Sequence, residues 1–138
     1  MERTLTILKP DSVAAGNSGK IIDHLEAEGF EVVAIRKLRL SEAQAQAFYE
    51  VHRERPFYSS LVAFMTEGPV VAMALERENA VRKLREVMGA TNPDDAAPGT
   101  VRALHASSIE RNAIHGSDSP ENAVLELAFF FSRVDLIG

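Results

Sequence analysis

Hydrophobic and polar residues alternate near the N-terminus with the period of a β-strand. Leu5 and Ile7 alternate with two threonines, which predicts a half-buried strand whose apolar side chains face a core. Lys9 has the parity of Leu5 and Ile7, so we expect its stem on the core side and its ammonium at the end of the sheet. Pro10 has no N–H to donate, and it therefore ends the ladder.

Further along the chain, the pattern changes between helical and strand periods. Ile21, Ile22 and Leu25 at helical spacing predict a helix that stops at Gly29. A later helix opens on a capping box that starts at Ser41. The predicted elements are, in order, a strand over 30–40 with Val32, Ala34, Leu38 and Leu40 on one face, a helix over 41–52 with an apolar stripe of Ala43, Ala47, Phe48 and Val51, a short helix over 56–65, a continuously apolar strand over 70–75, and a helix over 78–88 with Val81, Leu84 and Met88 facing the core.

The last third of the chain has a long segment with little periodicity. Residues 89–114 carry Thr91, Arg102 and Asn112, and loops longer than about 12–15 residues in a compact domain are usually functional or disordered, so we favour function. A helix over 120–127 then leads into a short final strand over 128–131. Without the extra helices and the loop, the order is βαββαβ, which predicts a mixed α/β (α+β) fold of the ferredoxin-like kind, an antiparallel sheet with helices on one face.

Length and composition restrict the possible classes of protein. A chain of 138 residues with 46% hydrophobic residues can build one core, so we expect a single domain over 1–138. The net charge of −5 argues against general binding to nucleic acid or anionic membrane, although a local group of cations could hold a phosphorylated substrate. No apolar run approaches the ~18 residues that span a bilayer, and the N-terminus shows no secretory signal. The lack of cysteine excludes disulfides and fits a cytoplasmic location.

The most distinctive stretch is Asn112-Ala113-Ile114-His115-Gly116-Ser117-Asp118, which comes just before a helix start at Ser119-Pro120. A histidine in a glycine-bearing turn could be a nucleophile, a general base or a metal ligand, or simply a surface residue. The motif resembles the active-site sequence of nucleoside diphosphate kinases. Five further segments resemble that family and come in the family's order. They are 4–11, 55–58, 68–72, 88–93 and 98–102, and with the motif around His115 the resemblance covers nearly the whole chain.

The resemblance implies an enzyme that moves the γ-phosphate of a nucleoside triphosphate, typically ATP, to a nucleoside diphosphate by a ping-pong mechanism. His115 would be the nucleophile that carries the phosphate. Glu126 would accept a hydrogen bond from the other ring nitrogen of His115, Ser117 would lie nearby, and Tyr49 would support the lysine and the histidine. The phosphates would be held by Lys9, Arg85, Arg102 and the Thr91 hydroxyl.

The resemblance also implies how the nucleoside is held. Phe57 would stack on the base with an apolar contact from Leu61, and a stack tolerates every base. The ribose hydroxyls would contact Lys9 and Asn112, whether the sugar is ribose or deoxyribose, and in the family the 3′-hydroxyl also bonds back to the phosphates. Ile109 and Gly116 complete the expected nucleotide contacts. Mg²⁺ would come with the nucleotide, held mainly by phosphates and water, because the sequence shows no dedicated cluster of carboxylates.

Two alternatives and some departures from the family remain at this stage. A non-catalytic nucleotide-sensing module would keep Phe57 and the arginines without needing His115, and a metal-binding protein would use His115, Asp118, His105 and His52. Ser12 stands where the family more often has Gly or Ala, which should matter little, and residues 104–108 are atypical. The length resembles that of prokaryotic members, and we expect a homo-oligomer, a tetramer or hexamer, in part because the strand over 32–40 could pair at a sheet edge.

Overall fold

Four strands form one antiparallel sheet in the order β2-β3-β1-β4. The structure, a computed structural model, describes residues 1–137. The central strands β1 and β3 pair from Glu2 opposite Arg77 to Leu8 opposite Val71. This order and the mixed α/β composition confirm the predicted ferredoxin-like fold. The strands are β1 (Glu2–Leu8), β2 (Glu31–Leu38), β3 (Val70–Arg77) and β4 (Ile114–Gly116).

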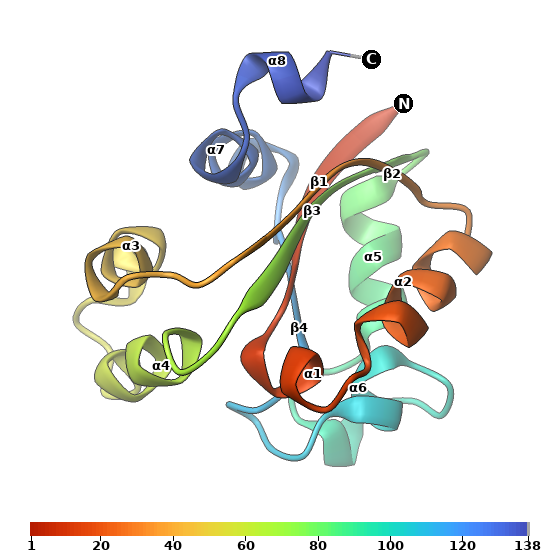
Figure 1. Ribbon diagram of the computed structural model, residues 1–138. Helices are drawn as coiled ribbons and strands as arrows, with labels where there is room; N and C mark the ends of the chain where they lie inside the picture. Colours follow the sequence, from red (N-terminus) through yellow and green to blue (C-terminus); the bar gives the residue numbers. More distant parts are fainter. Residues whose placement is uncertain (138) are drawn as a thin grey trace.

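Helices cover both faces of the sheet, because the added helices lie on the face that the ferredoxin-like plan leaves open. In Figure 1, α2, α5 and α6 lie on one side of the sheet, and α3, α4 and α7 lie on the other. The reason is visible in β3, whose apolar residues alternate between the two faces and so require cover on each. The helices are α1 (Pro10–Ala14), α2 (Ser18–Ala27), α3 (Glu42–Phe48), α4 (Tyr58–Met65), α5 (Ala80–Met88), α6 (Val101–His105), α7 (Pro120–Phe130) and α8 (Arg133–Leu136), with 3-10 turns η1 (Glu50–His52) and η2 (Pro93–Asp95).

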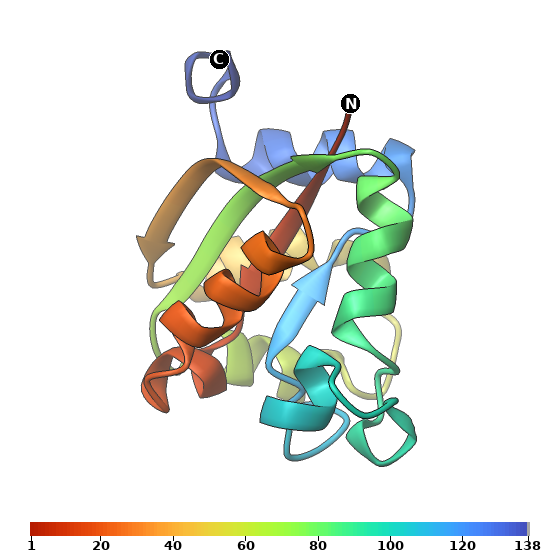
Figure 2. The same cartoon turned by 90° about the vertical axis from the view of Figure 1, so that its right-hand side faces the viewer.

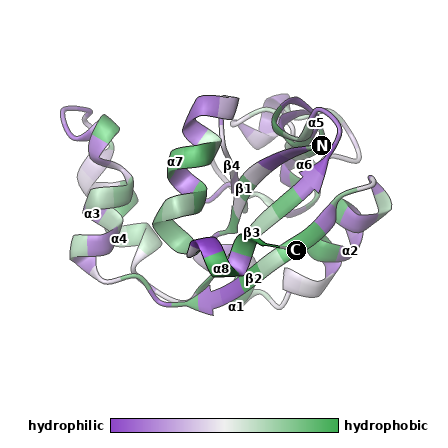
Figure 3. Ribbon diagram, turned by 90° about the horizontal axis from the view of Figure 1, so that it is seen from above, coloured by the Kyte–Doolittle hydropathy of each residue, from purple (hydrophilic) through white to green (hydrophobic). Residues whose placement is uncertain are grey.

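Two hydrophobic clusters result, one on each face. Seen from above in Figure 3, the largely hydrophobic strand β3 runs between α7 on one side and α2 and α5 on the other. The first cluster joins Leu5 and Ile7 of β1 to α3, α4 and α7. The second joins Leu8 and Met73 to α2 and α5. The sheet is therefore packed on both faces. It positions Lys9 at the C-terminal end of β1 and His115 in the middle of β4.

The fourth strand is not the predicted one. Residues 128–131 were expected to form it, but α7 continues to Phe130, and β4 lies earlier in the chain, beside β1 and near α5 (Figure 2). Ile7 of β1 faces His115 of β4 across the ladder. The three phenylalanines at 129–131 suggested a strand by propensity, but the helical period of α7 continues through Leu127 and Phe130, which are both buried.

Two predicted apolar faces were also wrong. A β-bulge between Val32 and Ala34 changes the register of β2, so Val32 packs on the second cluster while Ala34 and Leu38 pack on the first. In α3 the buried side chain is Ala45, with Phe48 partly buried, and Tyr49 directly after the helix is buried as well. Val51, predicted to lie on the apolar stripe, is 84% exposed because α3 ends at Phe48 and the chain tightens into η1.

Other local predictions were confirmed. The capping box of α3 is present, with the Ser41 side chain accepting from Gln44 N–H and the Gln44 side chain accepting from Ser41 N–H. Gly29 and Gly89 follow α2 and α5 with positive φ.

Residues 89–114 are not a structureless loop, since they contain η2 and α6. Among residues 1–137, no helix is both long and apolar enough to cross a membrane.

Candidate active site

His115 lies in the middle of β4, held by backbone and side chain. Its carbonyl accepts a hydrogen bond from the Thr6 hydroxyl at 2.7 Å, which ties β4 to β1. Its imidazole Nε2 lies 2.8 Å from Glu126 Oε1 of α7, and the imidazole is part-buried. The sequence predicted a turn here, but the pairing with β1 makes the backbone extended and fixes the side chain on the face that α7 covers.

Glu126 receives two hydrogen bonds on one oxygen. Ser117 Oγ donates to Glu126 Oε1 at 2.8 Å, and His115 Nε2 approaches the same atom. An ionised carboxylate only accepts, so Nε2 carries the proton and Nδ1 keeps a free lone pair, an assignment made from the hydrogen-bond partners. The arrangement brings together three of the predicted catalytic residues and leaves His115 with one nucleophilic nitrogen.

The chain reaches β4 through a strained turn at Ala113. Its φ is 74°, a conformation that side-chain-bearing residues rarely adopt, and Ile114 N–H donates to Asn112 O at 2.9 Å across it, as in a γ-turn. Asp11 Oδ2 accepts from Ala113 N–H at 3.1 Å. Ser12 Oγ, at 2.8 Å, and Lys9 N–H, at 3.0 Å, both donate to Ala113 O. The start of α1 therefore holds the turn that places Asn112 and His115.

Arg102 of α6 holds the same turn from the other side. Its guanidinium donates to Gly89 O at 3.0 Å, Asn112 O at 3.3 Å and Ile114 O at 2.8 Å, and the residue is buried. The predicted phosphate-binding arginine is thus also a structural clamp between α5, α6 and β4. Burial lowers the pKa of Arg102 to about 10, and the nearby positive charge of Arg85 contributes.

Lys9 lies at the end of β1, buried and close to other cations. Burial, together with the positive charge of Arg102, lowers the pKa of Lys9 to about 8, while the carboxylates of Asp11 and Glu110 act in the opposite direction. Lys9, Arg102 and Arg85 therefore form a region of concentrated positive charge in a protein of net charge −5. Such a region is suited to binding a polyanion.

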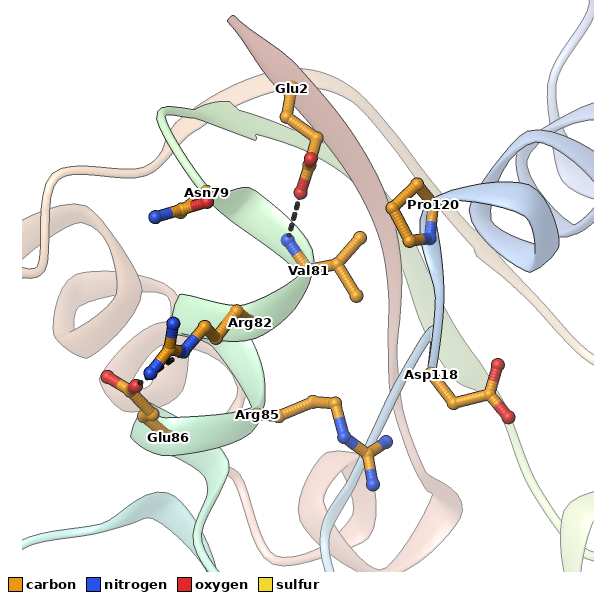
Figure 4. Close-up of a pocket in the computed structure, with 8 residues that line it drawn as sticks. All are labelled: Glu2, Asn79, Val81, Arg82, Arg85, Glu86, Asp118 and Pro120. Atoms are coloured by element: carbon orange, nitrogen blue, oxygen red, sulfur yellow. Dashed lines mark hydrogen bonds and ion pairs between the residues drawn. The ribbon is translucent and has the colours of Figure 1, made fainter.

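Two clefts meet at Arg85 of α5. One, of about 410 Å³, is lined by Arg85, Thr91 and Arg102 together with residues of the segment after α5. The other, of about 570 Å³, lies between α5, the start of β1 and the segment before α7, and Arg85 reaches into it opposite Asp118 (Figure 4). In that cleft Glu2 caps α5 by accepting from Val81 N–H at 2.8 Å. Thr91 and Arg85 thus line the same space as Arg102, and their contact with phosphates stays a prediction.

The residues expected around the nucleoside are more open. Phe57, before α4, is 46% exposed and lies 5.4 Å from His52 between ring centroids. Ile109 is 60% exposed, whereas Leu61 is buried in the first cluster. Asn112 is buried, its Nδ2 donates to Ile109 O at 2.9 Å, and within residues 1–137 its Oδ1 has no partner. A buried amide oxygen without a partner is costly, so a donor that reached it would be favoured.

Tyr49 is buried at the end of α3, but without the hydrogen bonds expected of a residue that supports Lys9 and His115. Its hydroxyl has no partner within residues 1–137. Burial raises the pKa of Tyr49 far above its ordinary value, and the negative charge of Glu126 adds to the effect. The hydroxyl is therefore protonated throughout the neutral range, close to the carboxylate that holds His115.

Packing against α5 explains why residue 116 is a glycine. A Cβ there would lie 2.7 Å from Met88 Sδ and 2.9 Å from Leu84 Cδ2, so only glycine lets α5 approach β4 this closely. The close approach holds α5, which carries Arg85, against β4. Gly116 thereby shapes the site, and its predicted contact with a nucleotide stays a prediction.

Reasoning from the sequence missed three residues of the site. Phe48 packs against the His115 ring, and Asp11 and Ser12 hold Ala113. Asp11 and Ser12 follow Lys9 directly, so their place at the end of β1 was a usable signal. Nothing in the local pattern connected Phe48 with His115, 67 positions later in the chain.

The metal-binding alternative finds no support. Among residues 1–137, no three histidine, aspartate or glutamate side chains lie together in a way that could hold a metal ion. The imidazole of His115 instead bonds to the Glu126 carboxylate, which also accepts a hydrogen bond from the Ser117 hydroxyl, an arrangement that orients a nucleophile.

Comparison with known proteins agrees with this geometry. The family model described as nucleoside diphosphate kinase matches residues 2–136. The chain belongs to the nucleoside diphosphate kinase family. A nucleoside diphosphate kinase of Wolinella succinogenes is 61% identical over 132 residues, 96% of each chain. The structure of the Aquifex aeolicus nucleoside diphosphate kinase is 46% identical with a TM-score of 0.96 over 99% of both chains.

A second solved structure, a halophilic nucleoside diphosphate kinase from Halobacterium salinarum in complex with CDP, is 40% identical with a TM-score of 0.95, covering 99% of this chain and 91% of that one. Membership in the nucleoside diphosphate kinase family supports an enzyme over the alternative of a non-catalytic sensing module. His115 with Glu126 behind it is the feature that such a module would not require.

Proposed function

We propose that this chain transfers the γ-phosphate of a nucleoside triphosphate to a nucleoside diphosphate in two half-reactions at His115. In the first, Nδ1 attacks the γ-phosphorus, an N–P bond forms, and the P–O bond to the β-phosphate breaks to release a nucleoside diphosphate. In the second, a terminal oxygen of another nucleoside diphosphate attacks the same phosphorus and the N–P bond breaks. One site serves both steps because donor and acceptor differ only in that phosphate.

The observation that carries the proposal is the 2.8 Å contact between His115 Nε2 and Glu126 Oε1, with Ser117 on the same oxygen. It supports a neutral imidazole with its lone pair on Nδ1. When Nδ1 bonds to phosphorus, positive charge develops on the ring, and the Glu126 carboxylate lies where it stabilises that charge.

The cations would bind and orient the phosphates. Lys9 and Arg102 are buried close to His115, and Arg85 and Thr91 line the adjoining cleft. Positive groups already fixed in place stabilise the charge that spreads over the phosphoryl oxygens without the cost of reorganisation. Arg85, Thr91 and Arg102 line one cleft, and Lys9 lies close enough to Arg102 for their charges to interact, which supports their role as the phosphate-binding group.

The nucleoside would lie at the open side of the cleft. Phe57, which is 46% exposed, offers a ring face for stacking, with Leu61 and Ile109 as apolar neighbours. The orphaned Asn112 Oδ1, with Lys9, would contact the ribose. A stack without hydrogen bonds to the base edge supports the same enzyme acting on all common bases and on ribo- and deoxyribonucleotides.

Mg²⁺ would arrive with the phosphates, since residues 1–137 offer no group of three acidic or histidine ligands to hold it. When bound there, the ion neutralises phosphate charge and favours transfer. The residues of this chain then have the separate tasks of orienting His115 and gripping the remaining phosphate oxygens.

We also propose that the chain is a single domain, acts in the cytoplasm and forms a homo-oligomer, a tetramer or hexamer. β2 lies at an edge of the sheet with Ile35 56% exposed, so a second copy could extend the sheet there. Light scattering at micromolar concentration measures the particle mass, and one chain per particle would refute the assembly.

The test of the reaction is the intact mass after incubation with MgATP and no acceptor. The wild type should gain one phosphate that is lost in acid, because a phosphoramidate hydrolyses once its nitrogen is protonated, and addition of GDP should remove it. His115→Ala should gain none, whereas His24→Ala, on α2 away from the site, should behave as the wild type. Stoichiometric phosphate on His115→Ala would show that another residue is the nucleophile.

A further inference from the structure

Phe48, the last residue of α3, packs against the imidazole of His115. The two ring centroids are 5.4 Å apart and the ring planes cross at 76°, an edge-to-face arrangement. Phe48 also meets Tyr49, Phe129 and Phe130 at centroid distances of 5.0, 5.2 and 5.3 Å. Phe48 is therefore the centre of an aromatic cluster. Two of the four rings that it contacts, those of His115 and Tyr49, are titratable.

A hydrogen bond at one end does not by itself fix the plane of a histidine ring. The torsion about the bond from Cβ to the imidazole is broad, with two orientations related by a half turn. The contact with Glu126 holds Nε2, but Nδ1 could still swing as the ring tilts about that contact. A ring packed against the imidazole restricts this tilt, because moving it would open a gap in a close-packed cluster.

Phe48 also changes the surroundings of the hydrogen bond. The Glu126 and His115 side chains are 23% and 21% exposed, and the Phe48 ring is an aromatic wall against the imidazole that takes space water would otherwise occupy. A charge-assisted hydrogen bond is stronger where the local dielectric is low. Loss of the wall would weaken the preference for a proton on Nε2 and allow the tautomer that carries it on Nδ1.

We propose that Phe48 is a positioning residue for phosphoryl transfer, which keeps the imidazole of His115 in the plane and tautomer that direct Nδ1 toward the phosphate. This rests on the proposed role of His115 as nucleophile. Phe48 ends α3, and Phe57 lies further along the same helical hairpin, just before α4. One hairpin would therefore both stack on the base, through Phe57, and orient the nucleophile, through Phe48. Phe48 does not touch the phosphates in this scheme, so nucleotide affinity should not depend on it.

The experiment compares Phe48→Leu with Phe48→Tyr and with a control, Phe129→Leu. Phe129 belongs to the same cluster, 5.2 Å from Phe48, and is 40% exposed. Phosphorylation of His115 by MgATP is followed in single turnovers across ATP concentrations, and ¹⁵N NMR of the unphosphorylated proteins reports which imidazole nitrogen carries the proton.

Phe48→Leu should lower the maximal rate about tenfold, near the upper limit for one aromatic pair, with half-saturating ATP changed less than about twofold. Its imidazole should show a mixture of tautomers, and both measurements should return to wild-type values in Phe48→Tyr and remain there in Phe129→Leu. If Phe48→Leu does not fold, Phe48→Met, which keeps the volume without the ring, takes its place.

Wild-type rate and a single tautomer in the leucine or methionine variant would overturn the role of Phe48, as would an equal loss in Phe129→Leu. If the wild type itself takes no phosphate on His115, the proposed function fails. The tautomer comparison needs no phosphorylation, so it still shows separately whether Phe48 orients the imidazole.

Discussion

The two sides of the site differ in how completely the protein builds them. On the nucleophile side, the polar groups of His115, Ser117 and Glu126 are joined in one hydrogen-bonded group, and Arg102 and Asp11 fix the turn that leads to it. On the nucleotide side, Phe57 and Ile109 are largely exposed, and Arg85 extends from α5 into open clefts.

The difference follows from what each side must do. Catalytic groups act efficiently when they are already in place, so that no reorganisation accompanies the reaction. A surface that accepts any base gains nothing from fixed polar partners, since these would read the base edge. Residues on the first side should therefore affect stability and rate together, and residues on the second should affect nucleotide use alone.

The largest effect should come from the two arginines, and it should separate the two sides. Arg102→Ala and Arg85→Ala should each cost roughly 2–4 kcal/mol of transition-state stabilisation, measured as kcat/KM. Only Arg102→Ala should also lower the free energy of unfolding, by about 3 kcal/mol, because three backbone carbonyls each lose one hydrogen bond. Urea unfolding measures this.

Arg133→Ala, at the exposed start of α8, serves as the control and should change neither quantity appreciably. Equal losses of stability in Arg85→Ala and Arg102→Ala would mean that the clamp around Asn112 and Ile114 does not hold the turn. The contrast between a built side and an open side would then fail.

The next effect concerns pH and Lys9. Its pKa of about 8 means that the ammonium is charged below pH 8 and lost above it, so kcat/KM should fall by up to about tenfold per pH unit in the alkaline range. Lys9→Arg should remove this fall, since a guanidinium stays charged. A wild-type profile that is flat to pH 10 would contradict the assignment.

The lowered pKa of Lys9 also predicts that stability rises with pH over the range in which kcat/KM falls. The folded-state pKa of Lys9 lies below its ordinary value of 10.5, so the cost of burying the charged form is complete below pH 8 and disappears as pH rises toward 10.5. The contribution of Lys9 to the free energy of unfolding should therefore increase over that range. Lys9→Met, which removes the charge, should lose this dependence in urea titrations at several pH values.

Exchanging the base of the nucleotide should change the efficiency of phosphorylation only a little, and removing the 3′-hydroxyl of the sugar should lower it more. ATP, GTP, CTP and UTP should phosphorylate His115 with efficiencies within about 1–2 kcal/mol of one another, the spread of unequal stacking on Phe57. 3′-deoxy-ATP should lose more, because it leaves the buried Asn112 Oδ1 without a partner. A hundredfold preference for one base, or no penalty for the missing hydroxyl, would contradict this view of the open side.

The smallest effect should come from Ser12, although its hydroxyl is buried on the nucleophile side. Ser12→Ala removes one donor to Ala113 O, but Lys9 N–H donates to the same oxygen, so we expect a loss of about 1 kcal/mol or less in unfolding free energy. Ser59→Ala, at an exposed position of α4, is the control. A loss of several kcal/mol would show that the turn at Ala113 depends on this hydroxyl alone.

Local features of the sequence determined much of the molecule. The continuous apolar run of β3 and the capping box at Ser41 depend on neighbours within a few residues, and both appear in the structure as predicted. The alternation at Leu5 and Ile7 also marks a strand, but the prediction that this strand is half-buried was wrong, because Thr4 and Thr6 on its other face are buried as well. The resemblance of the segment around His115 also brought Glu126 and Ser117 into the site before any distance was known, and the structure joins all three.

Tertiary structure alone decided the remaining points. Residues 129–131 suit a strand by composition, but the buried face of α7 keeps them helical, and β4 forms earlier because β1 offers its free edge to His115. The bulge in β2, the packing of Phe48 on His115 and the three bonds of Arg102 each join residues that are far apart or depend on register. Such contacts are selected by the packing of the whole core and not by local period, which is why periodicity placed the elements and could not place these side chains.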